Sequence, residues 1–458
     1  MTLFDRPITP DNYSVIRFGL GYPARGAPRT APAMLERLLG PDHIVQDYPL
    51  FSFEKSLELG RAYSKAHKES RMTGDGAARK KVRSQIKMAF AQTVIDDFTR
   101  SVETDDPFRE RLQQFWMNHF TTRSKTLHLR TGHAGYAAEA IRPHLTGPFA
   151  EMLKSAVTHP FMLLYLDQTT SIGPNSIVGQ RRGRGLNENL AREVLELHTL
   201  GVGAGYTQAD VTEFAKLLTG LSFSPNDGFR FRAARAEPGP ETVLGQVYGG
   251  NGKASLADIH AALDDLARHP STAQFICTKL AAYFVADVPD ADLVASMIAA
   301  YERSGGYLAE VYGAMLDHPA AWDNFGAKVK WPVEFIITGM RALGVRAADL
   351  QAMKPRAVRR RILMPLRRMG QDYRAPPGPD GWPDTAAAWV DSQGLAARIG
   401  WAMAAARWAP GGPPDPRSFV ALALGGAASE GLIWAARAAE SRAEGVGIIL
   451  ASAEFNRR

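Results

Sequence analysis

The chain has 458 residues, of which 45% are hydrophobic and 22% are charged. This composition is that of a globular protein with a core large enough for two or three subdomains, and it excludes a disordered or low-complexity chain. The formal net charge of +7 is small for this length, so it does not by itself indicate the kind of partner.

Cysteine use and hydropathy bear on the cellular compartment. Cys277 is the single cysteine, so no intramolecular disulfide can form, and its apolar helical surroundings indicate a buried structural thiol. No apolar stretch approaches the length of a membrane span, and residues 1–23 lack the apolar core of a signal peptide. We therefore expect a cytoplasmic protein with no membrane span.

The positive charges gather in two regions. The first comprises Lys65, Lys68, Arg71, Arg79, Lys80, Lys81, Arg83 and Lys87, and the second comprises Lys354, Arg356, Arg359, Arg360, Arg361, Arg367, Arg368 and Arg374. Either region could meet phosphates or an acidic partner. Solvated helix faces are the simpler interpretation, because no aromatic interleaving and no known nucleic-acid motif accompanies the charge. Nucleic acid is therefore not expected as a partner.

Long helices are expected in the first part of the chain. Residues 52–71 and 77–102 show amphipathic spacing on either side of a glycine-rich breaker. Asp106-Pro107 then marks a helix start, and this helix ends in the aromatic run that holds Asn118 and His119. These two polar residues indicate either a pocket wall or core packing around a satisfied polar pair.

Three histidines are each followed by a proline at the start of a helical run. The pairs are His159-Pro160, His269-Pro270 and His318-Pro319. Proline at the first helical position explains all three, so they are not interpreted as a metal triad.

A long polar loop follows the first of these pairs, over residues 167–185. It carries Asn175, Arg181, Arg182 and Arg184. Long loops inside compact helical proteins are often functional, so the arginines predict either an anion clamp or lid, or an exposed basic loop.

The densest polar stretch of the chain predicts two helices joined by a glycine turn. Asn187 or Asn189 can cap a helix over about 188–200. Thr207 and Asp210 have the spacing of a capping box and begin the second helix.

Candidate site residues gather on and around the first of these helices. Candidate catalytic residues are Glu193, Glu196, His119 and His198, and candidate ligand-binding residues are Asn118, Asp167, Asn189 and Arg192. In this hypothesis a glutamate is the general base or a ligand, Arg192 orients an anionic group, and His119 is the acid or an extra ligand. The structural alternative is a charged network that ties the helix to its neighbours, with His198 as a hydrogen-bonded core histidine.

Geometry disfavours a metal ion bound by this helix alone. At about 100° per residue, Glu193 and Glu196 share one side with Asn189, whereas His198 points roughly 140–160° away. A metal would need ligands from elsewhere in the chain, so the cofactor stays unassigned, with a metal ion as one alternative.

The pattern changes after residue 220. An Asn-Asp-Gly turn at 226–228 between alternating Phe and Arg predicts a small β-hairpin, with 243–245 as a candidate extension. We therefore expect a mainly α protein, a large multi-helix bundle-like assembly with one small β-hairpin insertion. It would form a single unit over 1–458, or divide into helical parts 1–220 and 255–458 around a hairpin insertion at 221–254.

Several short motifs combine into one pattern over nearly the whole chain. They are Arg17-Phe18-Gly19-Leu20-Gly21, Phe115-Trp116-Met117-Asn118-His119-Phe120, Asn187-Glu188-Asn189-Leu190-Ala191-Arg192-Glu193, Glu196-Leu197-His198-Thr199-Leu200-Gly201, Tyr206-Thr207-Gln208-Ala209-Asp210-Val211, Lys330-Trp331-Pro332 and Gly381-Trp382-Pro383. In these motifs the sequence resembles the bacterial "domain of unknown function 1800" family.

The resemblance implies a mostly helical fold and no assigned activity. Many members look exported and occur beside a sulfatase-like family, which the resemblance implies as a candidate protein partner. This sequence departs from the family in lacking an export signal. It also carries Ala236-Glu237-Pro238-Gly239-Pro240-Glu241 where relatives tend to have a His-Asp pair and a Lys.

Two classes of function follow from these observations. The first is a helical enzyme or small-ligand-binding protein with a carboxylate, His and Arg pocket built around residues 187–211. The second is a non-catalytic assembly or adaptor protein whose polar network is structural. Phosphate or nucleic-acid binding through the two basic regions is a third alternative.

Overall fold

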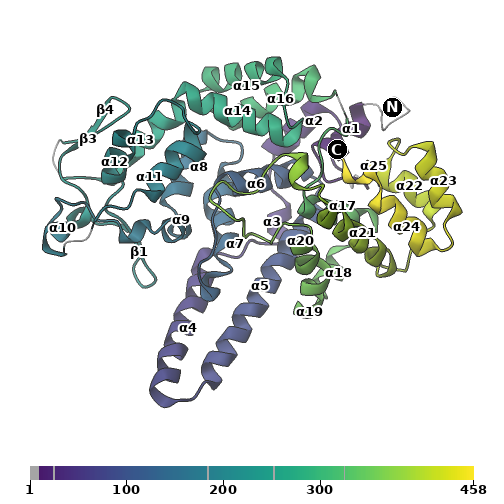
Figure 1. The fold of residues 1–458 in the computed structure, drawn as a ribbon, viewed down its shortest axis with the longest axis horizontal. Helices are drawn as coiled ribbons and strands as arrows, with labels where there is room; N and C mark the ends of the chain where they lie inside the picture. The colour runs from purple at the N-terminus through teal and green to yellow at the C-terminus, as the bar shows by residue number, and fades with distance from the viewer. Residues whose placement is uncertain (1–9, 24–25, 183–184, 251–252, 324) are drawn as a thin grey trace.

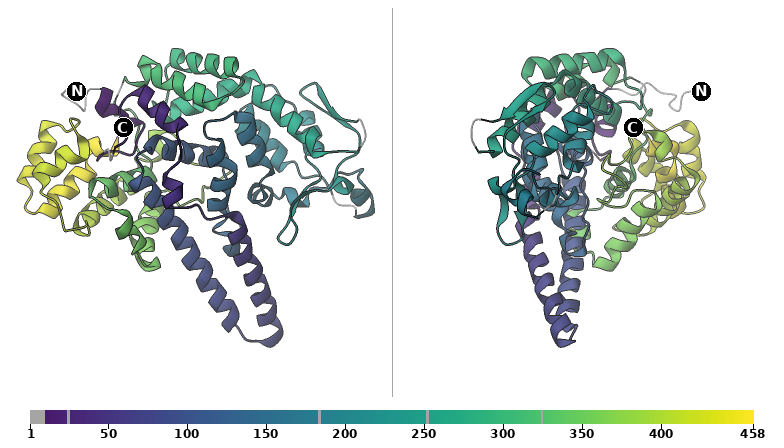
Figure 2. Two further views of the ribbon diagram at one scale, coloured as in Figure 1. Left: turned by 180° about the vertical axis from the view of Figure 1, so that it is seen from behind. Right: turned by 60° about the vertical axis from the view of Figure 1, so that its left-hand side comes forward.

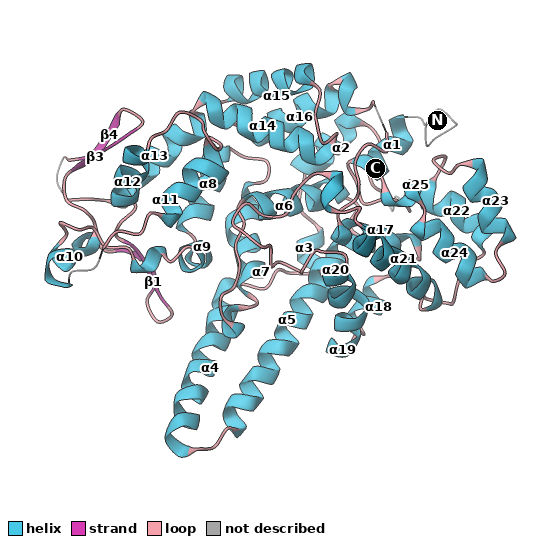
Figure 3. Cartoon of the chain, viewed as in Figure 1, coloured by secondary structure: helices cyan, strands magenta, loops and turns pink. Residues whose placement is uncertain are grey.

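The computed structural model describes residues 10–23, 26–182, 185–250, 253–323 and 325–458. Helices make up most of this part of the chain, and two small antiparallel hairpins lie together at one end (Figures 1 and 3). A mainly α fold is therefore confirmed. Among the described residues, no helix combines the length and the apolar character needed to cross a bilayer.

The elements follow one another in three groups. The first group is α1 (Pro10–Arg17), α2 (Ala31–Leu39), α3 (Ile44–Asp47), α4 (Phe53–Thr73), α5 (Ala77–Glu103), α6 (Pro107–His119), α7 (Gly132–Tyr136), α8 (Phe149–Thr158) and α9 (Pro160–Tyr165). The second is α10 (Ile177–Arg182), α11 (Asn189–Glu193), α12 (Gln208–Leu217), β1 (Leu221–Ser224), β2 (Gly228–Phe231), β3 (Pro240–Val243), β4 (Gln246–Gly249), α13 (Leu256–Arg268), α14 (Pro270–Phe284), α15 (Ala291–Ser304) and α16 (Leu308–Asp317). The third is α17 (Pro332–Ala342), α18 (Ala347–Gln351), α19 (Pro355–Val358), α20 (Met364–Arg368), α21 (Ser392–Arg407), α22 (Pro416–Leu424), α23 (Glu430–Ala438), α24 (Arg442–Ala451) and α25 (Ala453–Asn456).

Helices α4 and α5 form an arm that projects from the body of the protein (Figures 1 and 2). The Ser52 side chain caps α4 by accepting a bond from the Lys55 amide at 3.3 Å, and Gly74 ends it with a φ of 75°. The long helices predicted here are therefore confirmed. All eight basic residues of the first basic region lie on the arm and are exposed, as solvated helix faces require.

Two hydrophobic cores lie in the body. The first packs α6, α8, α9 and α11 to α16 around rings such as Trp116 and Phe149. The second packs the later part of α5 with α17 to α25 around Phe98 and Trp401. Helix α17 joins the two, because Trp331, just before it, belongs to the first core and Phe335, within it, belongs to the second.

Buried charges fix the helices at this junction. The Glu334 carboxylate on α17 lies 3.1 Å from the Nε atoms of both Arg111 and Arg458, and it accepts a hydrogen bond from the Tyr283 hydroxyl at 2.8 Å. All three charged side chains are at most 1% exposed. Because removing one partner of a buried ion pair costs about 3–5 kcal/mol, this network holds α6, α14 and α17 in fixed positions.

The three His-Pro pairs share one structural role. In each, the proline occupies the first turn of a helix, as predicted. The histidine is the N-cap, and its Nδ1 accepts a bond from the amide two residues on, at 3.1 Å for His159 and His269 and 3.3 Å for His318. The sequence did not indicate this capping by the imidazole ring.

The hairpins lie at one end of the molecule, with β3 against α12 and β1 against α9 (Figure 3). Strands β1 and β2 pair in the register Leu221 with Phe231, which confirms the predicted hairpin. The predicted extension by residues 243–245 is wrong, because β3 and β4 form a separate two-stranded sheet. Its turn holds Leu244 and Gly245 at φ of 51° and 79°, the left-handed pair that a tight hairpin turn requires.

Candidate functional site

The two helices of the densest polar stretch are present and change character halfway along the first. Helix α11 continues over Val194–Thr199 as a π-helical turn, in which the Leu200 amide donates to the Leu195 carbonyl at 3.0 Å. The second helix, α12, begins with the predicted capping box of Thr207 and Asp210. Glycines 201, 203 and 205 make the turn between them with positive φ angles.

Arg192 belongs to a network within this helix pair. Its guanidinium lies 3.5 Å from Glu188, 3.3 Å from Glu196 and 2.8 Å from the Gln208 side-chain oxygen. The Arg192 side chain is 39% exposed, so water screens these pairs. The network ties α11 to α12.

Glu193 differs from the other acids of the helix. It is half-buried and has no hydrogen-bond or ion-pair partner among the described residues. Burial, with Glu196 and then Asp380 as like charges nearby, raises the pKa of Glu193 to about 7. Asp380 comes from the loop after α20, so the structure brings that loop to α11. Proximity of these two segments was not part of the sequence prediction.

The two candidate histidines meet in the first core. The Nε2–H group of His119 donates to the His198 carbonyl at 3.1 Å, and the rings lie 6.0 Å apart. Both residues are at most 2% exposed. Burial is the main cause that lowers the pKa of both histidines, and the nearby charge of Lys279 is the second. The pKa of His198 falls to about 3. Both imidazoles are therefore neutral at ordinary pH.

The remaining candidates lie in three different places. Asp167 pairs with Lys125 at 2.6 Å on the surface, and Asn189 is exposed at the start of α11. Asn118 instead binds the backbone of Trp382, with Nδ2 donating to its carbonyl at 3.0 Å and Oδ1 accepting from its amide at 2.7 Å. The structure therefore places Glu193, Glu196 and Arg192 on one helix and pairs the two histidines, whereas the Asp167 and Asn118 side chains bind Lys125 and the Trp382 backbone.

The polar loop over 167–185 is partly helical. Helix α10 occupies its centre, Arg181 is exposed, and the Arg182 side chain and Arg184 lie outside the described residues. Asn175 donates from its side chain and its backbone to Glu237 at 2.5 and 2.9 Å. Glu237 belongs to the segment 236–241, and that segment is therefore anchored to the loop.

The described residues offer no ready-made metal centre. Within them, no three His, Cys, Asp or Glu side chains are grouped so that they could hold a metal ion. Glu193 and Glu196 are half-buried, whereas His198 is buried.

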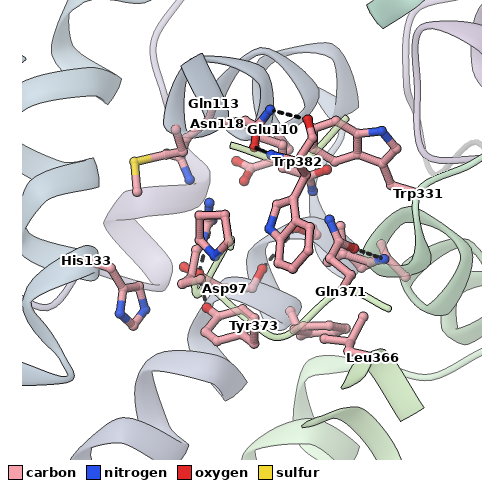
Figure 4. A pocket seen from close by; sticks show the side chains of 18 of the residues that line it. Asp97, Glu110, Gln113, Asn118, His133, Trp331, Leu366, Gln371, Tyr373 and Trp382 are labelled. Carbon is pink, nitrogen blue, oxygen red and sulfur yellow. Dashed lines mark hydrogen bonds and ion pairs between the residues drawn. The ribbon is translucent and has the colours of Figure 1, made fainter. Parts of the chain in front are cut away.

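A partly enclosed cavity, here called the central cavity, lies where the two cores meet. Its volume is about 70 Å³, and a water molecule needs about 10–15 Å³, so it can hold several waters or a small organic group. Helices α5, α6 and α17 and the loop after α20 form its walls (Figure 4). The lining residues are Asp97, Phe98, Ser101, Glu110, Gln113, Gln114, Met117, Asn118, Thr121, Thr122, His133, Trp331, Val333, Ile337, Leu366, Gln371, Tyr373, Arg374, Pro376 and Trp382.

The loop after α20 is held over the central cavity by two polar contacts. Asn118 binds the backbone of Trp382, as described above, and Gln371 accepts a bond from the Val333 amide at 2.8 Å (Figure 4). Gly381 has a φ of 81°, and a Cβ there would lie 2.6 Å from the Asn118 Oδ1 atom, so a glycine is required for the close approach.

Asp97 anchors the other end of the same loop. Its carboxylate binds Arg100 and the Tyr373 hydroxyl and lies 3.5 Å from Arg374 (Figure 4). Burial alone would raise the pKa of Asp97, but the two arginines lower it to about 2. The carboxylate is therefore ionised and fixes Tyr373 and Arg374 in the cavity wall.

Four residues of the central cavity carry buried polar atoms without a hydrogen-bond partner among the described residues. The atoms are Gln114 Oε1, Thr122 Oγ1, His133 Nε2 and Trp331 Nε1. The His133 Nδ1–H group donates to the Arg130 carbonyl at 3.0 Å, so Nε2 is an acceptor. Burial lowers the pKa of His133 to about 4, which keeps the ring neutral. Residues of the cavity wall thus carry unpaired acceptors and an unpaired Trp N–H donor.

Most residues of the central cavity were not identified from the sequence. Asn118 was a candidate, but Gln114, Thr122, His133 and Tyr373 were not singled out. Their segments are far apart in the chain, and single polar residues within apolar or aromatic runs have no spacing signal. The one usable signal was the amide-rich face of α6, where Gln113, Gln114 and Asn118 lie among aromatic residues.

The fold and the central cavity define a mainly helical protein with a polar cavity at the junction of two cores. The chain belongs to the family described as "Protein of unknown function (DUF1800)", whose family model matches residues 16–457. This match confirms the family that the sequence motifs indicated. No curated protein and no solved structure matches the chain.

Proposed function

We propose that the protein binds a small polar organic molecule in the central cavity. The observation that carries the proposal is the set of buried polar atoms in its wall that have no protein partner. Leaving a buried donor or acceptor unpaired costs about 1–3 kcal/mol, so an occupant that pairs with these atoms recovers that free energy. Several convergent polar groups in a partly enclosed, mostly apolar site are typical of small-molecule pockets.

The wall also limits the chemistry of the ligand. His133 Nε2 can accept a hydrogen bond from a ligand, and Trp331 Nε1 can donate one to it. The ligand should therefore carry both a donor, such as a hydroxyl or amide N–H, and an acceptor oxygen. Because rings of Phe98, Trp331 and Trp382 line the same space, part of the ligand is apolar.

Occupancy can be tested on the purified protein. Val333→Phe places a ring in the cavity, and Val288→Phe adds the same ring at a surface site that is 88% exposed. Small molecules released by denaturation are identified by mass spectrometry. We expect one released species from the wild type and from Val288→Phe, and its loss in Val333→Phe. Equal release from all three proteins, or no release and no thermal shift with a small-molecule cell extract, contradicts the proposal.

A second candidate function is acid–base chemistry at Glu193. The observation that favours it is a half-buried carboxyl with a pKa near 7, which suits a general base or acid at neutral pH. Glu188 on the same helix is the matched control, because its bonds to Thr212 and Gln208 lower its pKa. Carbodiimide reacts with protonated carboxyls, so labelling at pH 6 should modify Glu193 more than Glu188. Equal labelling of the two contradicts this candidate.

A further inference from the structure

A second cavity adjoins the central cavity on the side of α7. Its volume is about 180 Å³. Its wall contains three arginines, Arg123, Arg130 and Arg374, and the rings of Phe90, Phe161 and Tyr373. We call this space the arginine pocket.

The charges in the arginine pocket are unbalanced. Arg123 and Arg130 have no carboxylate partner among the described residues. Arg374 lies 3.5 Å from Asp97, and the one acid in the wall, Asp372, lies 3.9 Å from Arg367 outside the pocket. Two guanidinium groups are therefore available to a negatively charged occupant, and guanidinium binds carboxylate or phosphate oxygens in a bidentate manner.

Two of the three arginines make contacts that restrict their positions. The Arg130 guanidinium lies over the Phe90 ring, 4.3 Å from its centroid, which restricts its position. Arg374 has a φ of 52°, which is uncommon for a residue other than glycine, and its guanidinium lies 3.5 Å from Asp97.

The two cavities share part of their walls. His133, Tyr373 and Arg374 line both. His133 is 4% exposed, and its Nε2 atom has no partner among the described residues. The two cavities are therefore neighbours that meet at these three side chains.

From this geometry we propose that the ligand of the central cavity is an organic acid whose oxyanion group is held in the arginine pocket. The inference rests on the proposed function, because it gives the class of ligand for the same site. A carboxylate and a phosphate monoester share the required chemistry, and the aromatic walls suit a flat body between the charged end and the hydroxyl or amide end.

Titration calorimetry on the full chain measures the binding of four probes. They are 4-hydroxybenzoate, 4-hydroxyphenyl phosphate, the neutral 4-hydroxybenzyl alcohol and inorganic phosphate. We expect one or both organic anions to bind and the neutral alcohol to bind at least about tenfold more weakly, since a hydrogen bond to a charged group contributes about 1.5–3 kcal/mol. Which anion binds more tightly distinguishes the carboxylate from the phosphate.

Variants locate the binding. Arg130→Gln should weaken binding of the organic anion about ten- to a hundredfold, whereas Arg79→Gln, on the exposed arm, should leave it unchanged. Thr122→Val should weaken the organic anions but not inorganic phosphate, because only the longer molecules reach the central cavity.

Three outcomes overturn the inference. They are no binding of either organic anion, equal binding of the neutral alcohol, and organic-anion binding that Thr122→Val does not change. The release experiment with Val333→Phe distinguishes failure of the anionic-ligand inference from failure of the proposed function. A neutral species that is released from the wild type and lost in Val333→Phe contradicts the anionic ligand and leaves the central cavity as a binding site.

Discussion

The α11–α12 helix pair and the central cavity are both rich in polar side chains, but they use them differently. Around Arg192 the polar groups bind one another and are partly exposed to water. In the central cavity several polar atoms are buried and have no protein partner. The comparison shows that a dense run of polar residues can have its hydrogen-bonding groups paired with one another. What distinguishes the two regions is whether the hydrogen bonds are already made.

The largest effect is expected where the wall of the central cavity is anchored. Asp97→Asn leaves the buried Arg100 and the half-buried Arg374 without their carboxylate, so the free energy of unfolding should fall by about 3–5 kcal/mol. Asp372→Asn is the control, because that exposed acid lies 3.9 Å from Arg367 and should change stability by less than about 0.5 kcal/mol. Urea denaturation measures both. Similar losses in the two variants would show that the Asp97 network is not an anchor.

Two adjacent threonines allow a sharper test of paired and unpaired groups. Both line the central cavity and are buried, but the Thr121 hydroxyl donates to the Asn118 carbonyl at 2.5 Å, whereas Thr122 Oγ1 has no partner among the described residues. In ligand-free protein, Thr122→Val should raise the free energy of unfolding by about 1 kcal/mol, and Thr121→Val should lower it by a similar amount. Opposite signs in thermal or urea unfolding are the expected result. A loss of stability in both would mean that Thr122 is already satisfied.

A smaller effect is expected in the helix pair. Arg192→Ala removes contacts to Glu188, Glu196 and Gln208, but the side chain is 39% exposed, so the loss of stability should be at most about 1 kcal/mol. Ligand release from the central cavity should not change. A loss of bound ligand in this variant would instead support the pocket around residues 187–211 that the sequence suggested.

A pH dependence of stability is expected at Glu193. Its pKa is about 7 in the folded protein, above the ordinary value of 4.5, so the folded state favours the protonated carboxyl. This contribution to stability is complete below about pH 4.5 and is lost as the pH rises to 7 and above. Glutamine does not ionise, so Glu193→Gln should not lose stability as the pH rises. Between pH 5 and 8 the variant should therefore become increasingly more stable than the wild type. Melting temperatures across this range measure the difference, and parallel curves for the two proteins would contradict the raised pKa.

Local signals in the sequence were sufficient for most of the fold. The caps at Ser52 and Thr207, the glycine at 74 and the prolines after the three histidines act within one or two turns, so their pattern is visible in the chain. The second hairpin was missed because its turn is Leu244-Gly245, which lacks the Asn or Asp of the usual signal.

The candidate site was harder to predict from the sequence than the fold, for a physical reason. Angular spacing can relate Glu193, Glu196 and His198 because they lie in one helical run, but the π-helical turn over Val194–Thr199 departs from the 100° per residue of an α-helix. The contact of Glu193 with the loop that holds Asp380, and the central cavity itself, depend on segments more than a hundred residues apart. Their meeting is decided by packing of the two cores, which no local pattern in one sequence records.

The position of the central cavity gives the protein a specific thermodynamic property. Its walls come from both cores, with Met117 in the first and Ile337 and Leu366 in the second. A molecule bound there adds its binding free energy only while both cores are folded and docked. Occupancy therefore couples the two cores into one cooperative unfolding unit, so that a calorimetric scan of the loaded protein should show a single, sharper transition than that of the empty one.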